Sequence, residues 1–156
     1  MLDKFKHLHF KEANTQFDPS VKLQKNNGRI VAQLEHASAI GCLMYLVQCT
    51  RPDIAFVVSK MSRFTRNPNA KHWKAITRIF GYLLKTKNLG LHYGRFHAIL
   101  EGYIDVICIS SVGDHKSTTW WIFKLAGGAI TWKSKKQTCI SLSTMELEFM
   151  ALAFAG

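Results

Sequence analysis

Residues 118–134, TTWWIFKLAGGAITWKS, decide the second half of the fold. Two runs rich in β-branched and aromatic residues flank the pair Gly127-Gly128, a pattern typical of strands joined by a hairpin turn. Residues 99–110 and the shorter segment 89–93 have a similar composition, so strands are expected there as well. The pattern predicts a short antiparallel meander of three main strands in this half of the chain.

The preceding part of the chain has a helical period. Apolar residues recur at helical spacing in residues 33–48, 54–64 and 71–87, which predicts three helices joined by short links. Thr50 is expected to cap the second helix, with Pro52 in its first turn. Together the two halves predict an α+β fold, in which a small helical bundle is followed by an antiparallel sheet.

The first 31 residues show no clear periodicity. Turn signals at Asp18-Pro19 and Asn26-Asn27-Gly28 interrupt them. We therefore expect a loosely ordered lead-in at residues 1–31, a helical region at residues 32–88 and a third region at residues 89–156.

Positive charge is concentrated in the first two thirds of the chain. The net charge is +11, and residues 1–98 carry sixteen Lys and Arg against five Asp and Glu, whereas residues 99–156 carry five of each. Basic side chains bind nucleic acid by releasing counterions from phosphates, although a solvated cationic surface has the same composition. The candidate phosphate contacts are Lys60, Arg63, Arg66, Lys74, Arg78, Lys133, Lys135 and Lys136. The last three also fit the solvated end of a hairpin.

The sequence also indicates the cellular compartment of the protein. The four cysteines have no CxxC spacing, so neither zinc nor a disulfide framework is expected, and the seven histidines are expected at the surface or in packing. The N-terminus lacks the apolar run of a secretory signal, and the longest apolar stretch, residues 37–47, is too short to cross a bilayer. We expect a soluble intracellular protein, cytoplasmic or nuclear, without a membrane partner.

Two glutamates in residues 141–152, SLSTMELEFMAL, differ in their expected roles. Ser143 and Glu146 have the spacing of a capping box, which gives Glu146 a structural task at the start of a helix. Glu148 falls on the helical stripe of Met145 and Leu152, the face expected to pack on the sheet. Burying an unpaired carboxylate is costly, so we expect Glu148 either to bind a cation or to take part in a reaction.

Asp105 is the candidate neighbour of Glu148. Side chains alternate along a strand, so Tyr103, Asp105 and Ile107 share one face. If the helix covers that face, two carboxylates converge there, and Mg²⁺ would relieve their repulsion. Alternatively, Asp105 is exposed and Glu148 pairs with a lysine.

Four segments carry a resemblance to a known family: CTRPDIAFVVSKMSRFTRNP, HWKAITRIFGYLLKTKNLGLHY, LEGYIDVICIS, and DHKSTTWWIFKLAGGAITWKSKKQTCISLSTMELEFMAL. From about Phe17 to its end, the chain resembles the pol polyprotein of copia-type (Pseudoviridae) LTR retrotransposons, across the join between reverse transcriptase and ribonuclease H. The resemblance implies that residues 32–88 are the end of the thumb and connecting region of the polymerase. It implies that residues 89–156 are an incomplete, truncated RNase H-like unit with three strands and the first helix.

The resemblance also assigns roles to the two carboxylates. In that family an aspartate of the first strand and a glutamate of the first helix are two of four carboxylates that bind two Mg²⁺ ions and cut the RNA of an RNA–DNA hybrid. Asp105 and Glu148 match these catalytic and metal-binding positions. The sequence departs from the family pattern around them, because bulky residues surround Asp105 and Thr119-Trp120 stands where the family has Ser-Gly. The other two carboxylates and the polymerase aspartates have no counterpart in these 156 residues.

Three functions therefore remain open. The first is a fragment of a reverse transcriptase/RNase H polyprotein that needs the missing polymerase and RNase H segments as partners and is expected to be inactive alone, with Mg²⁺ weak or absent. The second is a non-catalytic remnant that binds RNA–DNA hybrids or a nucleic-acid backbone through its basic helices. The third is a translated transposon relic without a function.

Overall fold

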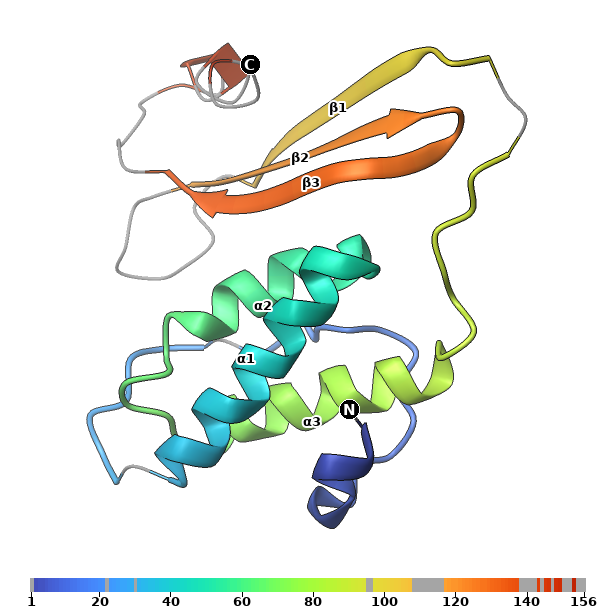
Figure 1. Cartoon of the computed structure of the whole chain (residues 1–156). Helices are drawn as coiled ribbons and strands as arrows, with labels where there is room; N and C mark the ends of the chain where they lie inside the picture. Colours follow the sequence, from blue (N-terminus) through green and yellow to red (C-terminus); the bar gives the residue numbers. More distant parts are fainter. Residues whose placement is uncertain are drawn as a thin grey trace. The chain divides into compact units, whose positions relative to one another are not determined.

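The computed structural model divides the chain into two compact units, Met1–Gly90 and Leu91–Gly156, called here the helical unit and the sheet unit. It describes residues 2–21, 23–29, 31–94, 97–107 and 117–137, and the single positions 143, 145, 146, 148, 149 and 153. The first unit consists of helices and connecting segments, and the second contains a three-stranded antiparallel sheet (Figure 1). The prediction of an α+β fold is confirmed.

Three α-helices form the helical unit, together with two short 3₁₀ helices. The elements in chain order are η1 Leu2–Leu8, α1 Gln33–Cys49, η2 Pro52–Ile54, α2 Ala55–Ser62 and α3 Ala70–Lys85. The three predicted helices are confirmed to within two residues at each end. Their fully buried apolar side chains, each at most 3% exposed, form one core: Ala39, Ile40, Leu43, Ile54, Val57, Val58, Met61, Ile76, Ile79 and Phe80.

The link between α1 and α2 differs from the prediction. Thr50 follows the end of α1, where its backbone N–H donates to the Leu46 carbonyl at 3.0 Å, and it does not cap the next helix. Arg51 is the N-cap residue of η2. Pro52 is the first residue of η2, a position at which its missing N–H costs no helical hydrogen bond. The turn therefore needs no hydroxyl cap.

The start of α3 depends on a buried histidine. The Asn69 side chain accepts a hydrogen bond from the backbone N–H of His72 at 3.0 Å, and His72 Nδ1 accepts one from the backbone N–H of Asn69 at 3.0 Å. His72 Nε2 lies 3.1 Å from the Gln24 carbonyl oxygen. Because Nδ1 is the acceptor, the neutral ring carries its proton on Nε2 and satisfies both contacts. The ring caps the helix and ties the lead-in to it.

The first 31 residues contribute to the core. Phe5 in η1 is 1% exposed and stacks on Phe80 with 5.0 Å between ring centroids, and Leu23 is 6% exposed. At Gly81 the backbone of the lead-in lies directly on α3, because a Cβ there would stand 2.0 Å from the Lys11 carbonyl oxygen. The expectation of a loosely ordered lead-in did not anticipate this packing, since irregular backbone leaves no periodic pattern in the sequence.

Two helix glycines give a matched pair of predictions. We expect Gly81→Ala to destabilise the protein by about 2 kcal/mol, because the new methyl group must displace the backbone at Lys11. We expect Gly41→Ala, in the middle of α1, to stabilise it by about 0.8 kcal/mol, because nothing lies within 4 Å of the added Cβ and alanine favours helix. Urea denaturation of both variants measures the difference, and equal effects would contradict the close approach at Gly81.

The sheet unit contains β1 Leu100–Ile107, β2 Thr118–Leu125 and β3 Gly128–Lys136 in the order β1-β2-β3. Both neighbouring pairs are antiparallel, which confirms the predicted meander. The hairpin between β2 and β3 turns at Ala126 and Gly127, whose φ angles are 51° and 77°. Two positive φ angles suit the right-handed twist of a hairpin, and they place the turn one residue before the predicted Gly127-Gly128 pair.

Residues 89–93 do not form the strand that their composition predicts. Instead, the Tyr93 hydroxyl donates a hydrogen bond to the Ala129 carbonyl at 2.8 Å. Gly128 makes room for this contact, because a Cβ there would stand 2.3 Å from the Tyr93 ring. Tyr93, whose aromatic ring contributed to the strand prediction, therefore packs on the hairpin instead. The predicted strand residues 108–110 lie outside the described residues.

Candidate functional site

Asp105 lies near the end of β1, directly opposite Trp120 of β2. Directly opposite residues of an antiparallel pair have their side chains on one face, so the Trp120 indole adjoins the carboxylate. Asp105 is exposed, and its Oδ1 accepts a hydrogen bond from the backbone N–H of Val106 at 2.8 Å. The Trp120 departure from the family pattern therefore places a large side chain beside the candidate metal ligand.

The segment that carries Glu148 begins with the expected cap. The Ser143 hydroxyl accepts a hydrogen bond from the backbone N–H of Glu146 at 3.2 Å, which confirms the N-cap half of the predicted capping box. The described positions that follow, 145, 146, 148, 149 and 153, are helical.

Glu148 is exposed, contrary to the expectation that its stripe packs on the sheet. Met145, on the same stripe, is 67% exposed. On the face of β1 that was expected to receive this helix, Glu101, Tyr103 and Asp105 are exposed as well.

The described residues do not fit a two-ion centre. Asp105 and Glu148 are the two carboxylates that match the family's positions, and within the described ranges no three His, Cys, Asp or Glu side chains gather as a metal-binding group. Two-metal catalysis requires two ions held about 4 Å apart. Asp105 and Glu148 by themselves offer too few ligands for that arrangement.

The sheet separates the three candidate lysines of β3 between its faces. Lys133 lies opposite Trp121 and Lys135 opposite Thr119, on the face away from Asp105, whereas Lys136 pairs with Thr118 on the other face. A shallow hollow of about 90 Å³ is lined by Thr119, Trp121, Lys133, Lys135, Lys136 and Gln137.

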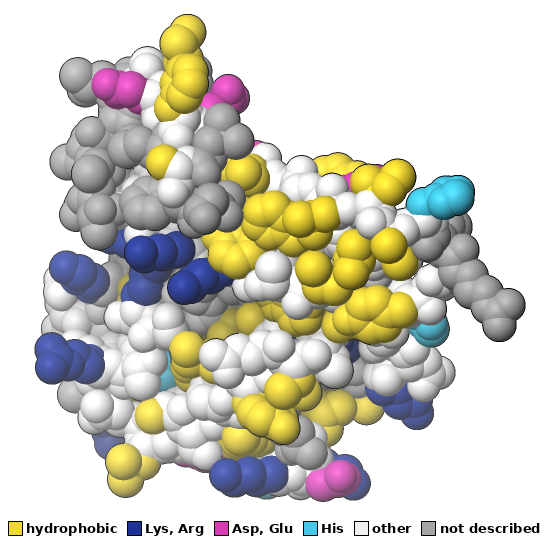
Figure 2. Space-filling view, turned by 45° about the horizontal axis from the view of Figure 1, so that its top comes forward, with side chains coloured by type: hydrophobic (Ala, Val, Ile, Leu, Met, Phe, Trp, Pro, Cys, Tyr) yellow, Lys and Arg dark blue, Asp and Glu magenta, His cyan; other side chains and the backbone are white. Residues whose placement is uncertain are grey.

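The candidate cations of the helical unit have two kinds of environment. Arg66 and Lys74 are exposed. The Lys60 ammonium is half-buried 4.6 Å from the centre of the Phe17 ring, and burial, followed by the charge of Arg63, lowers its pKa. On the face seen in Figure 2, Lys and Arg side chains gather in separate groups, and hydrophobic side chains form a broader area between them. The exposed cations are available to a phosphate, while the half-buried ones also stabilise the unit.

Arg63 and Arg78 belong to the half-buried group. Burial lowers the pKa of Arg63. Arg78 donates to Thr15 at the backbone carbonyl (3.2 Å) and at the side-chain hydroxyl (2.8 Å), and it lies 3.5 Å from the Asp18 carboxylate. Arg78 therefore fastens the lead-in to α3.

Sequence reasoning missed a buried polar network around Arg51. This guanidinium, 6% exposed, donates two hydrogen bonds to Asp53, at 2.9 and 2.7 Å, and further bonds to the Thr86 carbonyl and hydroxyl at 3.2 and 2.7 Å. The Tyr82 hydroxyl donates to Asp53 at 2.9 Å. The sequence signal was Arg-Pro-Asp at positions 51–53, whereas Tyr82 and Thr86, the other members of the network, lie about thirty residues further along the chain.

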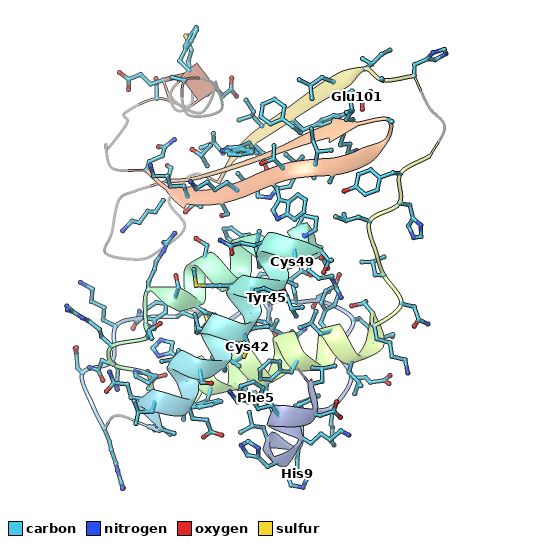
Figure 3. The ribbon with its side chains drawn as sticks, in the orientation of Figure 1. Phe5, His9, Cys42, Tyr45, Cys49 and Glu101 are labelled. Atoms are coloured by element: carbon cyan, nitrogen blue, oxygen red, sulfur yellow. The ribbon has the colours of Figure 1, made fainter. Side chains whose placement is uncertain are left out.

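Two thiols lie on α1. Cys42 is partly buried and Cys49 is exposed, both are free, and Tyr45 lies between them along the helix (Figure 3). A hydrogen bond with Cys49 raises the pKa of the Tyr45 phenol. Cys108 and Cys139 lie outside the described residues.

Known proteins show the same sequence pattern. The chain is 38% identical over 164 positions to the retrovirus-related Pol polyprotein from transposon TNT 1-94 of Nicotiana tabacum, with 100% of the chain covered. It is 33% identical over 145 positions to the Pol polyprotein from transposon RE1 of Arabidopsis thaliana, with 92% covered. The Plasmopara viticola protein called secreted RxLR effector protein 161 is 42% identical over 121 positions, which cover 77% of the chain and 85% of that protein.

The homologues of this chain are thus retrovirus-related Pol polyproteins from plant copia-type transposons. The chain spans only 12% of the Nicotiana and 10% of the Arabidopsis Pol polyprotein. No protein-family model and no solved structure matches it. None of the helices in the described part of this Pol segment is both long and apolar enough to cross a membrane.

Proposed function

We propose that this Pol segment joins the thumb and connecting region of a reverse transcriptase to the start of an RNase H domain. The observation that carries the proposal is the change near Gly90, where a helical unit gives way to an antiparallel meander with Asp105 in its first strand. The Ser143-capped segment with Glu148 follows the third strand, in the order that the resemblance implies. Both features support the proposed junction.

We expect a polypeptide of these 156 residues to be inactive as a nuclease. Mg²⁺, when bound in an RNase H site, would neutralise the phosphate and activate water for attack. Here Asp105 has one oxygen engaged by a backbone N–H and a tryptophan opposite it, and Glu148 is exposed. Activity is expected to require further carboxylates from other segments of the polyprotein.

A cleavage assay tests this expectation. With an RNA–DNA hybrid and either Mg²⁺ or Mn²⁺, we expect no cleavage above background by the 156-residue chain, and the same background for Asp105→Asn and Glu148→Gln. Wild-type cleavage that both substitutions abolish would show that the expected inactivity is wrong and that the two carboxylates form the site.

Binding to the backbone of nucleic acid is a second candidate function. The helical unit carries fifteen Lys and Arg against five Asp and Glu, and Arg66 and Lys74 are exposed on it. An excess of positive charge on one unit favours association with phosphates without reading the bases. A transposon relic without function would carry no selected affinity of this kind.

Salt dependence tests this binding. We expect the dissociation constant for single- or double-stranded nucleic acid to rise about 100-fold between roughly 50 and 200 mM salt, as for a handful of phosphate contacts. Combined Arg66→Glu and Lys74→Glu should weaken binding more than Lys133→Glu and Lys136→Glu in the sheet unit. An affinity that does not change with salt would contradict the electrostatic account, as would a larger loss from the sheet-unit variant.

A further inference from the structure

The helical unit contains a cavity of about 540 Å³ between residues 16–21 and one side of α3. Its volume falls within the range of small-molecule sites, a few hundred to about a thousand Å³. The lining residues are Gln16, Phe17, Asp18, Ser20, Val21, Lys71, Lys74, Ala75 and Arg78.

The walls of the cavity are held in place by their own contacts. Asp18 accepts hydrogen bonds from the Ser20 backbone N–H at 3.1 Å and the Ser20 hydroxyl at 2.6 Å. Arg78 binds Thr15, as described above, and lies 3.5 Å from Asp18. The Phe17 ring is held against the Lys60 ammonium. The cavity is therefore formed before any ligand arrives, which limits the ordering that binding requires.

Three kinds of surface meet in this cavity. Phe17, Val21 and Ala75 provide an apolar surface. Lys71 and Lys74 provide a cationic surface; both are exposed, and their ammonium groups make no hydrogen bond or salt bridge within the described part of the chain. Asp18 provides an acceptor. The hydrogen bonds from Ser20 lower the pKa of Asp18, so at neutral pH its carboxylate accepts hydrogen bonds and does not donate them.

A ligand that satisfies all three surfaces needs a flat apolar part, N–H or O–H donors, and a negative charge. A nucleoside phosphate has these parts in its base, its sugar hydroxyls or amino groups, and its phosphate. A fatty acid lacks the donors for Asp18, and inorganic phosphate leaves the apolar surface uncovered.

We propose that this cavity binds a nucleoside monophosphate group, either as a free nucleotide or as the terminal nucleotide of a strand. The base lies against Phe17 and Ala75, a sugar or base donor bonds to Asp18, and the phosphate is held by Lys71 and Lys74. Electrostatic binding along a backbone needs no base, so this site goes beyond the proposed function and is tested separately.

NMR titration of the full chain with adenosine 5′-monophosphate tests the site. We expect shifts at Phe17, Val21 and Ala75, and an affinity about tenfold greater than that for adenosine or for inorganic phosphate. A dinucleotide with a 5′-phosphate distinguishes the sources: equal binding assigns the terminal nucleotide of a strand, and binding of the mononucleotide alone assigns the free nucleotide. Phosphate that binds as tightly as the nucleotide would overturn the proposal, as would shifts confined to residues outside the cavity.

Matched variants locate the binding. We expect Ala75→Phe, which fills the apolar part, and Lys74→Glu to weaken nucleotide binding about tenfold or more, whereas Lys87→Glu, the same charge change on an exposed lysine outside the cavity, should change it less than about twofold. If Ala75→Phe disturbs folding, the comparison of Lys74→Glu with Lys87→Glu decides. Equal losses in these two variants would overturn the site. Salt-dependent polynucleotide binding should persist in Ala75→Phe, so the cavity and the backbone binding can fail independently.

Discussion

Replacing Asp53 with alanine is expected to lower the free energy of unfolding by about 3 kcal/mol, because it leaves the Arg51 guanidinium buried without its counter-charge. Arg51 is 6% exposed and forms two hydrogen bonds with Asp53. The two remaining bonds from Arg51 to Thr86 hold its position but supply no negative charge. Urea denaturation at neutral pH measures the loss.

Tyr82→Phe is the matched control for this network. It removes the single hydrogen bond of 2.9 Å to Asp53 and leaves the ion pair in place, so a loss of about 1 kcal/mol is expected. An Asp53→Ala variant that loses no more than Tyr82→Phe would show that the charge on Asp53 contributes little to stability.

Acidification is expected to reduce stability by about 3 kcal/mol through His36 alone. This ring is fully buried, lies edge-on to Trp73 at 5.6 Å, and has no hydrogen-bond partner on either nitrogen among the described residues. Burial, followed by the charge of His72, lowers its pKa from 6.5 to about 4. The folded protein therefore keeps His36 neutral, while the unfolded chain takes up a proton near pH 6.5.

The direction in which stability changes with pH follows from that difference in proton binding. The stability that the neutral ring confers is fully present above pH 6.5 and is lost as the pH falls from 6.5 to about 4. Burial opposes ionisation of Asp53, but the hydrogen bonds from Arg51 and Tyr82 and the charge of Arg51 together lower its pKa, so Asp53 loses its contribution at lower pH still. Denaturation midpoints measured across this range report the change.

His36→Leu separates the histidine from other acid effects. The variant keeps an apolar side chain in the core and removes two unsatisfied nitrogens, so most of the stability change between pH 6.5 and 4 should disappear. A smaller dependence should remain, because burial also lowers the pKa of His72. An unchanged pH profile would contradict the assignment to His36.

The sequence alone determined the elements whose signals are local. Helical spacing placed α1, α2 and α3 to within two residues, and the composition of residues 118–125 gave the bounds of β2. The capping spacing at Ser143 was also readable, because cap and helix are neighbours in the chain. The excess of positive charge in the helical unit follows from counting residues and needs no structure.

Only the tertiary structure decided the features that depend on contacts between distant residues. The stacking of Phe5 on Phe80, the approach of Lys11 to Gly81 and the cavity beside α3 join the lead-in to a helix about sixty or more residues away. No local pattern encodes such contacts, because irregular backbone has no period and a buried histidine has the same letter as an exposed one.

The candidate carboxylates show the same division. Strand alternation predicted the face of Asp105, but only the register placed Trp120 opposite it. The helical stripe predicted a buried Glu148, whereas the structure exposes it, because burial depends on the apolar surface that a neighbouring element offers and not on the period of the helix itself.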